Sequence, residues 1–259
     1  MVEGLDQASS ERRSGRSGGG RSALITGATG GIGSAVARAL ALRGYRVGLL
    51  ARREGPLRVL AEELGGFSLP CDVTDADAVV AAVARFEQET GGPLELVVSC
   101  AGAFSLQRVN ELDPEELERQ LSVNLLGSIL LARAVLPGMR KAGRGILLQV
   151  GSVAGRKPLP GNAAYAASKY GLRGFHEVLR DELRGSGVRV TLLEPAATDT
   201  PLWDPLDPDA DHALPNRSDM LRAEDVAEAV LFAAERPNGV QIPYLSIERV
   251  PGVAPSMRT

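Results

Sequence analysis

Tyr165 and Lys169, in the sequence YAASK, are spaced so that one side chain could tune the proton chemistry of the other. Residues four apart lie on the same face of an α-helix, so the phenol and the ammonium point the same way. A nearby cation favours the phenolate and lowers a phenol pKa that is ordinarily about 10. Such a tyrosine can act as general acid when a ketone is reduced and as general base when an alcohol is oxidised. Taken alone, the pair is also common on solvated helices.

Ser152 comes two residues after an apolar run, residues 145–150, that is typical of a buried strand. In open α/β sheets, ligands bind at the carboxyl ends of the strands. The Ser152 hydroxyl is therefore placed where it could hold a carbonyl oxygen.

The glycine-rich sequence TGATGGIG, residues 26–33, lies between an apolar run and a helical pattern. Glycines let the backbone approach a pyrophosphate, and the N–H groups at a helix start attract its charge. Gly27, Gly31 and Gly33 are spaced as G-x-x-x-G-x-G, which differs from the G-x-G-x-x-G fingerprint. A purely structural turn is the alternative, but the position after the first strand favours a dinucleotide site.

Arg52 and Arg53 follow the second apolar run, where a dinucleotide fold places the side chain that meets the adenosine ribose. A carboxylate at this point selects NAD, whereas arginine accommodates the 2′-phosphate of NADP. The sequence therefore predicts NADP(H), with NAD(H) the less favoured cofactor. The alternative is that both arginines only decorate a solvated loop.

The elements that must position these residues are short apolar strands, typical of parallel strands covered on both faces, alternating with helical patterns. This alternation indicates successive βαβ units and an α/β fold. The predicted strands are residues 22–26, 46–50, 67–70, 94–99, 145–150, 189–194 and 244–250. The predicted helices are residues 32–43, 56–64, 76–89, 113–136, 162–184 and 223–234, with Asp113 as a cap and Pro114 in the first turn.

Two segments lack either pattern. Residues 1–20 have almost no apolar side chains to bury, which predicts a disordered tail before a domain at residues 21–259. Residues 196–220 carry repeated Pro and Asp, which predicts an irregular lid after the sixth strand. Trp203 in this lid either closes over a bound molecule or anchors the segment by packing.

The overall composition argues against several other partners. A net charge of -3 and a pI near 5.6 provide no basic field for nucleic acid. Cys71 and Cys100 follow apolar runs and are expected to be core thiols, and His176 and His212 lack the clustered partners of a metal site. No apolar run approaches the roughly 20 residues of a membrane span, and no apolar signal core is visible at the N-terminus. We expect a cytoplasmic protein without a membrane partner.

The glycine-rich turn, Cys100-Ala101-Gly102, Asn124, Ser152, YAASK and the sequence EPAATDTP at residues 194–201 together resemble the short-chain dehydrogenase/reductase family. The resemblance extends from residue 21 to about residue 250. It implies a single Rossmann-like doubly wound parallel sheet of strand order 3-2-1-4-5-6-7. It also implies that Tyr165 exchanges the proton, Ser152 orients the substrate oxygen, Lys169 binds the nicotinamide ribose and acidifies Tyr165, and Asn124 holds a relay water.

The same resemblance implies a set of cofactor contacts. Asp72 and Val73 match positions at the adenine ring, and Thr200 matches a position near the nicotinamide carboxamide. The full predicted cofactor set is Gly27, Thr29, Gly31, Ile32, Gly33, Arg52, Arg53, Asp72, Val73, Ala101, Gly102, Tyr165, Lys169, Pro195, Thr198 and Thr200.

Three features depart from the family pattern. Cys100 replaces the usual Asn, which removes a side-chain hydrogen bond to nearby backbone, and Ala196 replaces the usual Gly, which adds a Cβ beside the nicotinamide position. The C-terminal sequence IPYLSIERV lacks a glycine-rich ending, which leaves homodimer and homotetramer both open. The predicted activity is NADP(H)-dependent interconversion of a small-molecule carbonyl and an alcohol. A cofactor-binding sensor or scaffold without turnover is the alternative.

Overall fold

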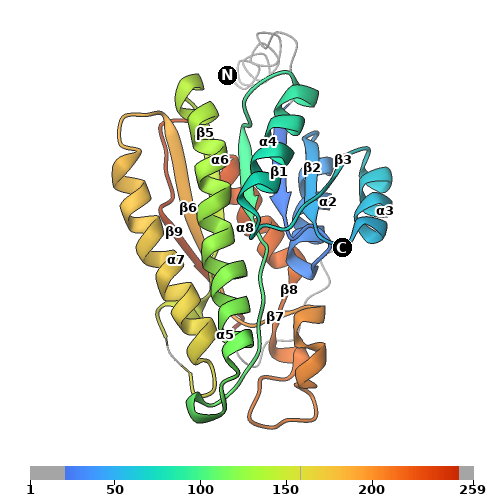
Figure 1. The fold of residues 1–259 in the computed structure, drawn as a ribbon, viewed down its shortest axis with the longest axis vertical. Coiled ribbons are helices and arrows are strands. Elements are labelled where there is room, and N and C mark those ends of the chain that lie inside the picture. Colours follow the sequence, from blue (N-terminus) through green and yellow to red (C-terminus); the bar gives the residue numbers. More distant parts are fainter. Residues whose placement is uncertain (1–20, 158, 251–259) are drawn as a thin grey trace, which may run out of the picture.

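The computed structural model of the protein describes residues 21–157 and 159–250. Seven parallel strands form one sheet in the order β3-β2-β1-β4-β5-β6-β9, with helices on both faces (Figure 1). The strands are β1 (Ser22–Thr26), β2 (Arg46–Ala51), β3 (Phe67–Pro70), β4 (Leu96–Ser99), β5 (Gly145–Val150), β6 (Val188–Pro195) and β9 (Tyr244–Ile247). The predicted order is confirmed, and its seventh strand is β9. The predicted tail at residues 1–20 lies outside the described residues.

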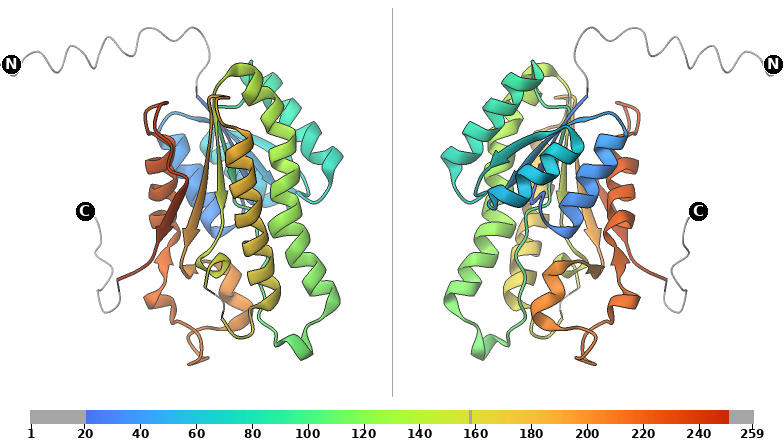
Figure 2. Two further views of the ribbon diagram at one scale, coloured as in Figure 1. Left: turned by 90° about the vertical axis from the view of Figure 1, so that its left-hand side faces the viewer. Right: turned by 90° about the vertical axis from the view of Figure 1, so that its right-hand side faces the viewer.

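The central strands are apolar along their whole length because both faces of the sheet are covered. On one face lie α2 (Gly31–Leu42), α3 (Glu54–Leu64) and α8 (Ala223–Ala234), and on the other lie α4 (Ala76–Thr90), α6 (Gly127–Ala142) and α7 (Ala163–Glu182). The two turned views show these layers edge-on (Figure 2). A separate hydrophobic core lies between the sheet and each helix layer, so the side chains of the central strands pack against helices on both faces.

The predicted helix at residues 113–136 is not continuous. It consists of α5 (Pro114–Leu121), a π-helical turn (Ser122–Leu126) and α6, which extends to Ala142. The cap is as predicted, because the Asp113 side chain accepts a hydrogen bond from Glu115 N and Pro114 opens the helix. A π turn contains one more residue than an α-helical turn, and the spacing of apolar residues in the sequence did not reveal this insertion.

The stretch Pro114–Ala142 contains an 18-residue segment with a mean hydropathy of 1.5, which is apolar enough to cross a membrane by length and composition alone. A buried helix of a soluble protein passes the same test. In the structure α5 packs against α7, and α6 packs against α4. Packing inside the fold therefore accounts for the apolar character of the buried part.

The predicted lid contains more regular structure than its sequence indicated. Strands β7 (Thr198–Asp199) and β8 (Leu221–Arg222) pair with each other, and 3-10 turns span Pro201–Leu206 and Arg217–Asp219. The lid lies at the carboxyl ends of the strands, close to α5 and to the start of α7 (Figures 1 and 2). This edge of the sheet carries the candidate site.

Candidate active site

A cavity of about 420 Å³ lies at the carboxyl edge of β1, β2 and β4. It brings together twelve of the predicted cofactor residues: Gly27, Thr29, Gly31, Ile32, Gly33, Arg52, Arg53, Asp72, Val73, Ala101, Gly102 and Thr200. The other four predicted residues, Tyr165, Lys169, Pro195 and Thr198, do not line it, and Lys169, Pro195 and Thr198 are buried. Its other lining residues are Gly30, Ala51, Cys71, Cys100, Ala103, Arg119, Val123, Pro201 and Leu202, which the sequence analysis did not predict as contacts.

The glycine-rich turn is shaped to leave the start of α2 open. Gly27 has a φ of +65°, and a Cβ there would lie 2.8 Å from the Ala101 backbone, so only glycine fits between β1 and the loop after β4. Within the described residues no side chain caps α2, and its first turn carries no acidic residue. The N–H groups and positive end of α2 therefore face the cavity without a competing anion. These features fit the pyrophosphate of a dinucleotide.

Arg52 and Arg53 are exposed at the mouth of the same cavity. Asp72 lies close by: burial raises its pKa, but hydrogen bonds from Thr74 and the charge of Arg52 outweigh this and hold the pKa below its usual range. Asp72 is thus an anion whose oxygen is fixed by Thr74. The arrangement places two guanidinium groups at the cavity, where they could bind an anionic group of a ligand.

Ser152, Tyr165 and Lys169 come together where β5 meets α7. Ser152 caps a short 3-10 turn by accepting a hydrogen bond from Ala154 N at 3.1 Å, and its hydroxyl also hydrogen-bonds with Tyr165. Lys169 Nζ donates to Val150 O at 3.0 Å and lies 5.5 Å from the centre of the Tyr165 ring. The i, i+4 spacing has therefore placed phenol and ammonium on one side of α7, as predicted.

Burial, rather than the ammonium, controls the proton affinity of this pair. Burial raises the pKa of Tyr165 to about 12, although the hydrogen bond with Ser152 opposes the shift. Burial also lowers the pKa of Lys169 to about 8. The prediction of a lowered phenol pKa is wrong for the groups of this chain. Lys169 is directed at the Val150 carbonyl, so its charge does not compensate the desolvation of the phenol.

Asn124 is held in the π turn between α5 and α6. Its Oδ1 accepts from Ala103 N at 2.7 Å, and its Nδ2 donates to Ala103 O at 2.9 Å and to Ser168 Oγ at 3.0 Å. Ser168 Oγ in turn donates to Tyr165 O at 2.7 Å. This chain of hydrogen bonds ties the loop after β4 to the turn of α7 that carries the tyrosine. The predicted relay water at Asn124 stays a prediction.

The lid rests on the glycine-rich turn. A Cβ on Gly31 would lie 2.5 Å from Thr200 Cγ2, so glycine is what allows this close approach. Arg217 joins the two halves of the lid through ion pairs to Asp199 at 2.6 Å and to Asp204 at 2.7 Å. These contacts hold the 3-10 turn Pro201–Leu206 against the cavity.

Trp203, in this 3-10 turn, packs against Phe104 of the loop after β4, and Phe104 packs against Tyr165. An anchoring contact for Trp203 is therefore present in the structure. The sequence analysis did not predict a role for Phe104, because the residues around it give no sign of its contacts with Tyr165 and Trp203, which are distant in the chain.

The sequence of the chain matches a known protein family. The model of the short chain dehydrogenase family matches residues 21–211, well over half of the chain. The chain belongs to the short-chain dehydrogenase family. The candidate residues Asn124, Ser152, Tyr165 and Lys169 and the strands from β1 to β7 lie within the matched range, and β8 and β9 lie beyond it.

Two relatives place this short-chain dehydrogenase among oxidoreductases. An uncharacterized oxidoreductase of Mycobacterium tuberculosis is 36% identical over 231 residues, covering 88% of this chain and 90% of the relative. The glycine betaine reductase ATRR of Emericella nidulans is 35% identical over 238 residues, or 88% of this chain. This chain spans only 19% of the length of that reductase.

Solved structures extend the likeness. The closed form of serine dehydrogenase complexed with NADP+ superimposes with a TM-score of 0.81 at 29% identity, covering 92% of this chain and all of the other. An alcohol dehydrogenase from the archaeon Thermococcus sibiricus, complexed with 5-hydroxy-NADP, gives a TM-score of 0.78 at 29% identity, with coverage of 91% and 99%. The protein is thus an oxidoreductase of the family, and neighbours of its fold bind NADP.

The departures from the family pattern are accommodated locally. At Cys100, the Thr26 hydroxyl accepts hydrogen bonds from Cys100 N and Ala101 N, both at 3.1 Å, so side-chain support for this loop comes from β1. Burial raises the pKa of the Cys100 thiol to about 12, which keeps it neutral. Ala196 N donates to Ile247 O at 2.9 Å and continues the pairing of β6 with β9.

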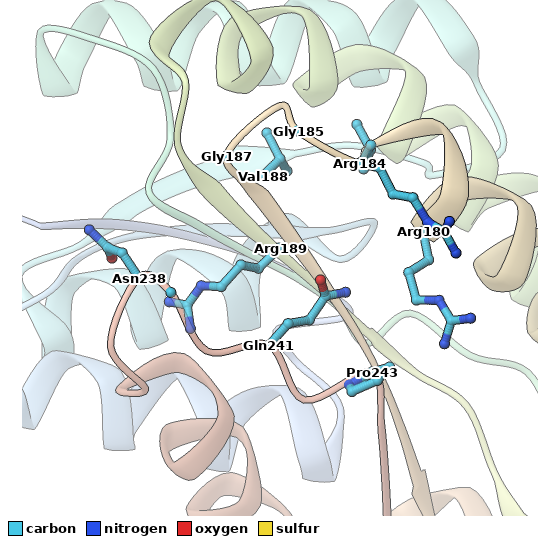
Figure 3. Close-up of a pocket in the computed structure, with 11 residues that line it drawn as sticks. Arg180, Arg184, Gly185, Gly187, Val188, Arg189, Asn238, Gln241 and Pro243 are labelled. Carbon is cyan, nitrogen blue, oxygen red and sulfur yellow. The ribbon is translucent and has the colours of Figure 1, made fainter.

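A second cavity of about 480 Å³ lies at the amino edge of β6, away from all of these residues. Arg180 and Arg184 of the α7 end lie on one side of it, and Arg189 of β6 lies on the other, with Gln241 between them (Figure 3). Arg189 donates to Val240 O at 2.9 Å and to Ala234 O at 3.4 Å. Arg184 is paired with a neighbouring aspartate at 2.9 Å.

Proposed function

We propose that this short-chain dehydrogenase is an NADP(H)-dependent reductase that converts a small-molecule carbonyl into an alcohol, with Tyr165 as the proton donor. The observation that supports it most is the junction of β5 and α7, where Ser152 and Tyr165 hydrogen-bond next to Lys169. The cavity at the carboxyl edge has a glycine turn and an uncapped helix that fit a dinucleotide, and Ala103 of its lining is hydrogen-bonded to Asn124.

Each side chain has a defined part in the reaction. When bound, the reduced nicotinamide supplies a hydride to the carbonyl carbon. Ser152 holds the carbonyl oxygen, and Tyr165 gives its phenolic proton to that oxygen, so that the alcohol leaves with one hydride and one proton added. Lys169 stabilises the tyrosinate through its charge until solvent returns the proton. Asn124 fixes the Ala103 loop and, through Ser168, the tyrosine backbone.

The proton affinity of Tyr165 supports reduction as the favoured direction. With a pKa near 12 the phenol is protonated throughout the physiological range, which is the form that a proton donor needs. The same protonated phenol is a poor base for alcohol oxidation. Reduction at neutral pH and oxidation only at high pH are the expected consequence.

Arg52 and Arg53 support NADP(H) over NAD(H). Both guanidinium groups lie at the cavity mouth, and Asp72, the carboxylate near Arg52, is engaged with Thr74. A phosphate dianion between two guanidinium groups forms charge-assisted hydrogen bonds, which are about twice as strong as neutral ones. The likeness to neighbours solved with NADP+ and 5-hydroxy-NADP points the same way.

The proposal includes a homodimer or homotetramer in the cytoplasm. Leu126, at the end of the π turn, and Tyr170 and Val178 of α7 are 44%, 44% and 58% exposed, and apolar side chains of this size support a docking face for a second copy. Cys71 and Cys100 are free thiols, in keeping with a reducing compartment. Light scattering of the purified protein would give the assembly mass, and a monomer would contradict the docking face.

The test of the proposed function is consumption of NADPH, and separately of NADH, with a panel of aldehydes, ketones and quinones. We expect NADPH-dependent turnover that falls by about 10²- to 10⁴-fold in Tyr165→Phe, the range associated with loss of a general acid. Binding of NADPH to the variant should be unchanged. Tight NADPH binding without turnover of any carbonyl would instead favour a cofactor-binding sensor.

A further inference from the structure

Three aromatic rings from three separate segments form a continuous row at the candidate active site. The Phe104 and Tyr165 ring centres are 4.9 Å apart at an interplanar angle of 71°, and the Phe104 and Trp203 centres are 5.0 Å apart at 63°. Both contacts are edge-to-face, the arrangement that aromatic rings prefer. The lid is thereby connected through Phe104 to the tyrosine that carries the proton.

We propose that Phe104 and Trp203 form the wall that receives the substituent of the substrate carbonyl, and that this wall selects carbonyls carrying a flat aromatic or conjugated ring. The inference rests on the proposed function, because it takes Tyr165 as the group that meets the carbonyl oxygen.

The position of Phe104 follows from hydrogen-bond geometry. A carbonyl oxygen that accepts the Tyr165 proton lies within about 3 Å of the phenolic oxygen. The Tyr165 ring itself is in contact with Phe104. The groups bonded to the carbonyl carbon therefore extend past Phe104, and those directed toward the lid meet Trp203 next.

The chemistry of the wall favours a flat group without negative charge. Phe104 and Trp203 present ring faces and edges, and the neighbouring Leu202 is 41% exposed at the cavity. The two carboxylates beside Trp203, Asp199 and Asp204, are both paired with Arg217. Because one guanidinium is shared by two carboxylates, this group keeps a net negative charge, which repels a carboxylate on the substrate, whereas an aryl group gains edge-to-face contacts.

The wall is also held in place before any substrate arrives. Trp203 N donates to Thr200 O at 3.1 Å, and Thr200 is seated on Gly31. Arg217 links the segments on both sides of the 3-10 turn. A pre-arranged wall loses little conformational freedom when substrate binds. The binding energy of the ring contacts is therefore not offset by the entropy cost of ordering the lid, and it contributes to substrate specificity.

Burial of the tyrosine supports the same arrangement. The phenol is desolvated, which raises its pKa, and Phe104 is one of the groups that cover it. An apolar cover of this kind suits an apolar substituent and disfavours one that must keep its own water.

The decisive experiment compares benzaldehyde with cyclohexanecarbaldehyde, which match in size but differ in flatness. We expect kcat/KM with NADPH to be about 10-fold higher for benzaldehyde, in line with one or two edge-to-face contacts. Benzaldehyde is the less electrophilic of the two, so intrinsic reactivity opposes the expected preference. Phe104→Leu and Trp203→Leu should each remove most of this preference, because they lower kcat/KM for benzaldehyde more than kcat/KM for cyclohexanecarbaldehyde or propanal.

Phe232→Leu is the matched control, since Phe232 is an aromatic residue of α8 that is 48% exposed and stacks with Arg236 outside the site. It should leave the aldehyde preference unchanged. Equal kcat/KM for the two aldehydes in the wild type, or an equal loss for benzaldehyde and propanal in Phe104→Leu, would overturn the aromatic wall while leaving the proposed function standing.

Trp203 is the single tryptophan of the chain, so its fluorescence tests the wall without turnover. In Tyr165→Phe loaded with NADP, benzyl alcohol should quench or shift Trp203 emission at concentrations at which cyclohexylmethanol does not. A selective response together with no turnover in the wild type would support the wall and contradict the proposed function. Identical responses to both alcohols, or none, would overturn the wall.

Discussion

The cavities at the two edges of the sheet are similar in volume, about 420 Å³ at the carboxyl edge and about 480 Å³ at the amino edge, and both contain arginines. The two cavities differ in whether their arginine side chains already have partners within the protein. At the amino edge Arg184 is paired with Asp181, and Arg189 is half-buried and bonded to backbone carbonyls. At the carboxyl edge Arg52 and Arg53 reach an exposed mouth. Cavity size and positive charge therefore do not distinguish a site, whereas groups still available to a ligand do.

The carboxyl edge also collects proton donors and open backbone groups from several segments. The α2 start, the loop after β4, the β5 end and α7 each contribute one part. One helix, α7, connects the two regions, with Lys169 of the candidate catalytic group near its start and Arg180 of the amino-edge cavity near its end. Substitutions along α7 can therefore test whether the two edges act independently.

The largest effect is expected from the titration of Lys169. Its pKa of about 8 and that of Tyr165 of about 12 are well separated, and kcat/KM reports groups of the free enzyme. Loss of the ammonium above pH 8 should lower kcat/KM for reduction about tenfold per pH unit, or about 100-fold by pH 10. Lys169→Arg, which stays charged, should move this limb upward. A flat profile between pH 7 and 10 would contradict a role for the ammonium.

The next effect is expected at the mouth of the carboxyl-edge cavity. Replacing Arg52 and Arg53 together with Ala removes charge-assisted hydrogen bonds to a 2′-phosphate, which at this exposed position contribute about 1.5–3 kcal/mol together. We expect kcat/KM for NADPH to fall by about 10- to 100-fold, while that for NADH stays within about twofold. Steady-state kinetics with both cofactors measures this. An equal loss for NADH and NADPH would show that the arginines support the loop and do not select the phosphate.

Substitution of His176, on α7 between Lys169 and Arg180, should affect stability and leave the reaction chemistry unchanged. His176 is fully buried, bonds Gln149 through Nδ1 at 3.1 Å, and burial lowers its pKa to about 4, with the cations of Arg180 and Arg173 acting in the same direction. The unfolded chain therefore binds the proton more readily, and the free energy of unfolding falls as the pH drops from about 6.5 to 4, by up to about 3 kcal/mol.

The check is urea unfolding of wild type and His176→Phe at pH 7 and pH 4.5. The variant should lose less stability on acidification, whatever its stability at pH 7. The same acid sensitivity in both proteins would place the cause elsewhere, in groups such as Glu177 that also act on the His176 pKa.

The smallest effect is expected from Arg180→Ala combined with Arg184→Ala at the amino edge. Their ion pairs with Asp181, at 4.0 and 2.9 Å, are exposed, and exposed pairs contribute about 0–1 kcal/mol. We expect kcat/KM and the affinity for NADPH to change by less than about twofold. A tenfold loss of kcat/KM without a change in folding would mean that α7 couples the two edges.

Much of the framework is predictable because it depends on local pattern. Apolar runs locate the strands, and Tyr165, Lys169, Ser152 and the glycine-rich turn lie where their spacing and strand ends place them. Strand ends were less certain: the last strand stops at Ile247, because its outer residues have no partner in the sheet.

The missed features depend on contacts between distant segments. The raised pKa of Tyr165 reflects desolvation by neighbours such as Phe104. The spacing of residues along the sequence does not show which distant groups bury the phenol. The Phe104 contact with Trp203 requires the lid to be seated, which depends on Arg217 and Thr200. The pairing of β7 with β8 involves two residues from each strand, too few for a periodic signal.

The π turn at Ser122–Leu126 has a consequence for the helical phase on either side of it. Each residue advances an α-helix by about 100°, so one residue more or less rotates everything upstream relative to α6 by that angle. Removing a residue here would leave a regular, stable helix, yet Arg119 would swing away from the dinucleotide cavity and Asn124 away from Ala103. The length of this segment, and not only its composition, is therefore under functional constraint.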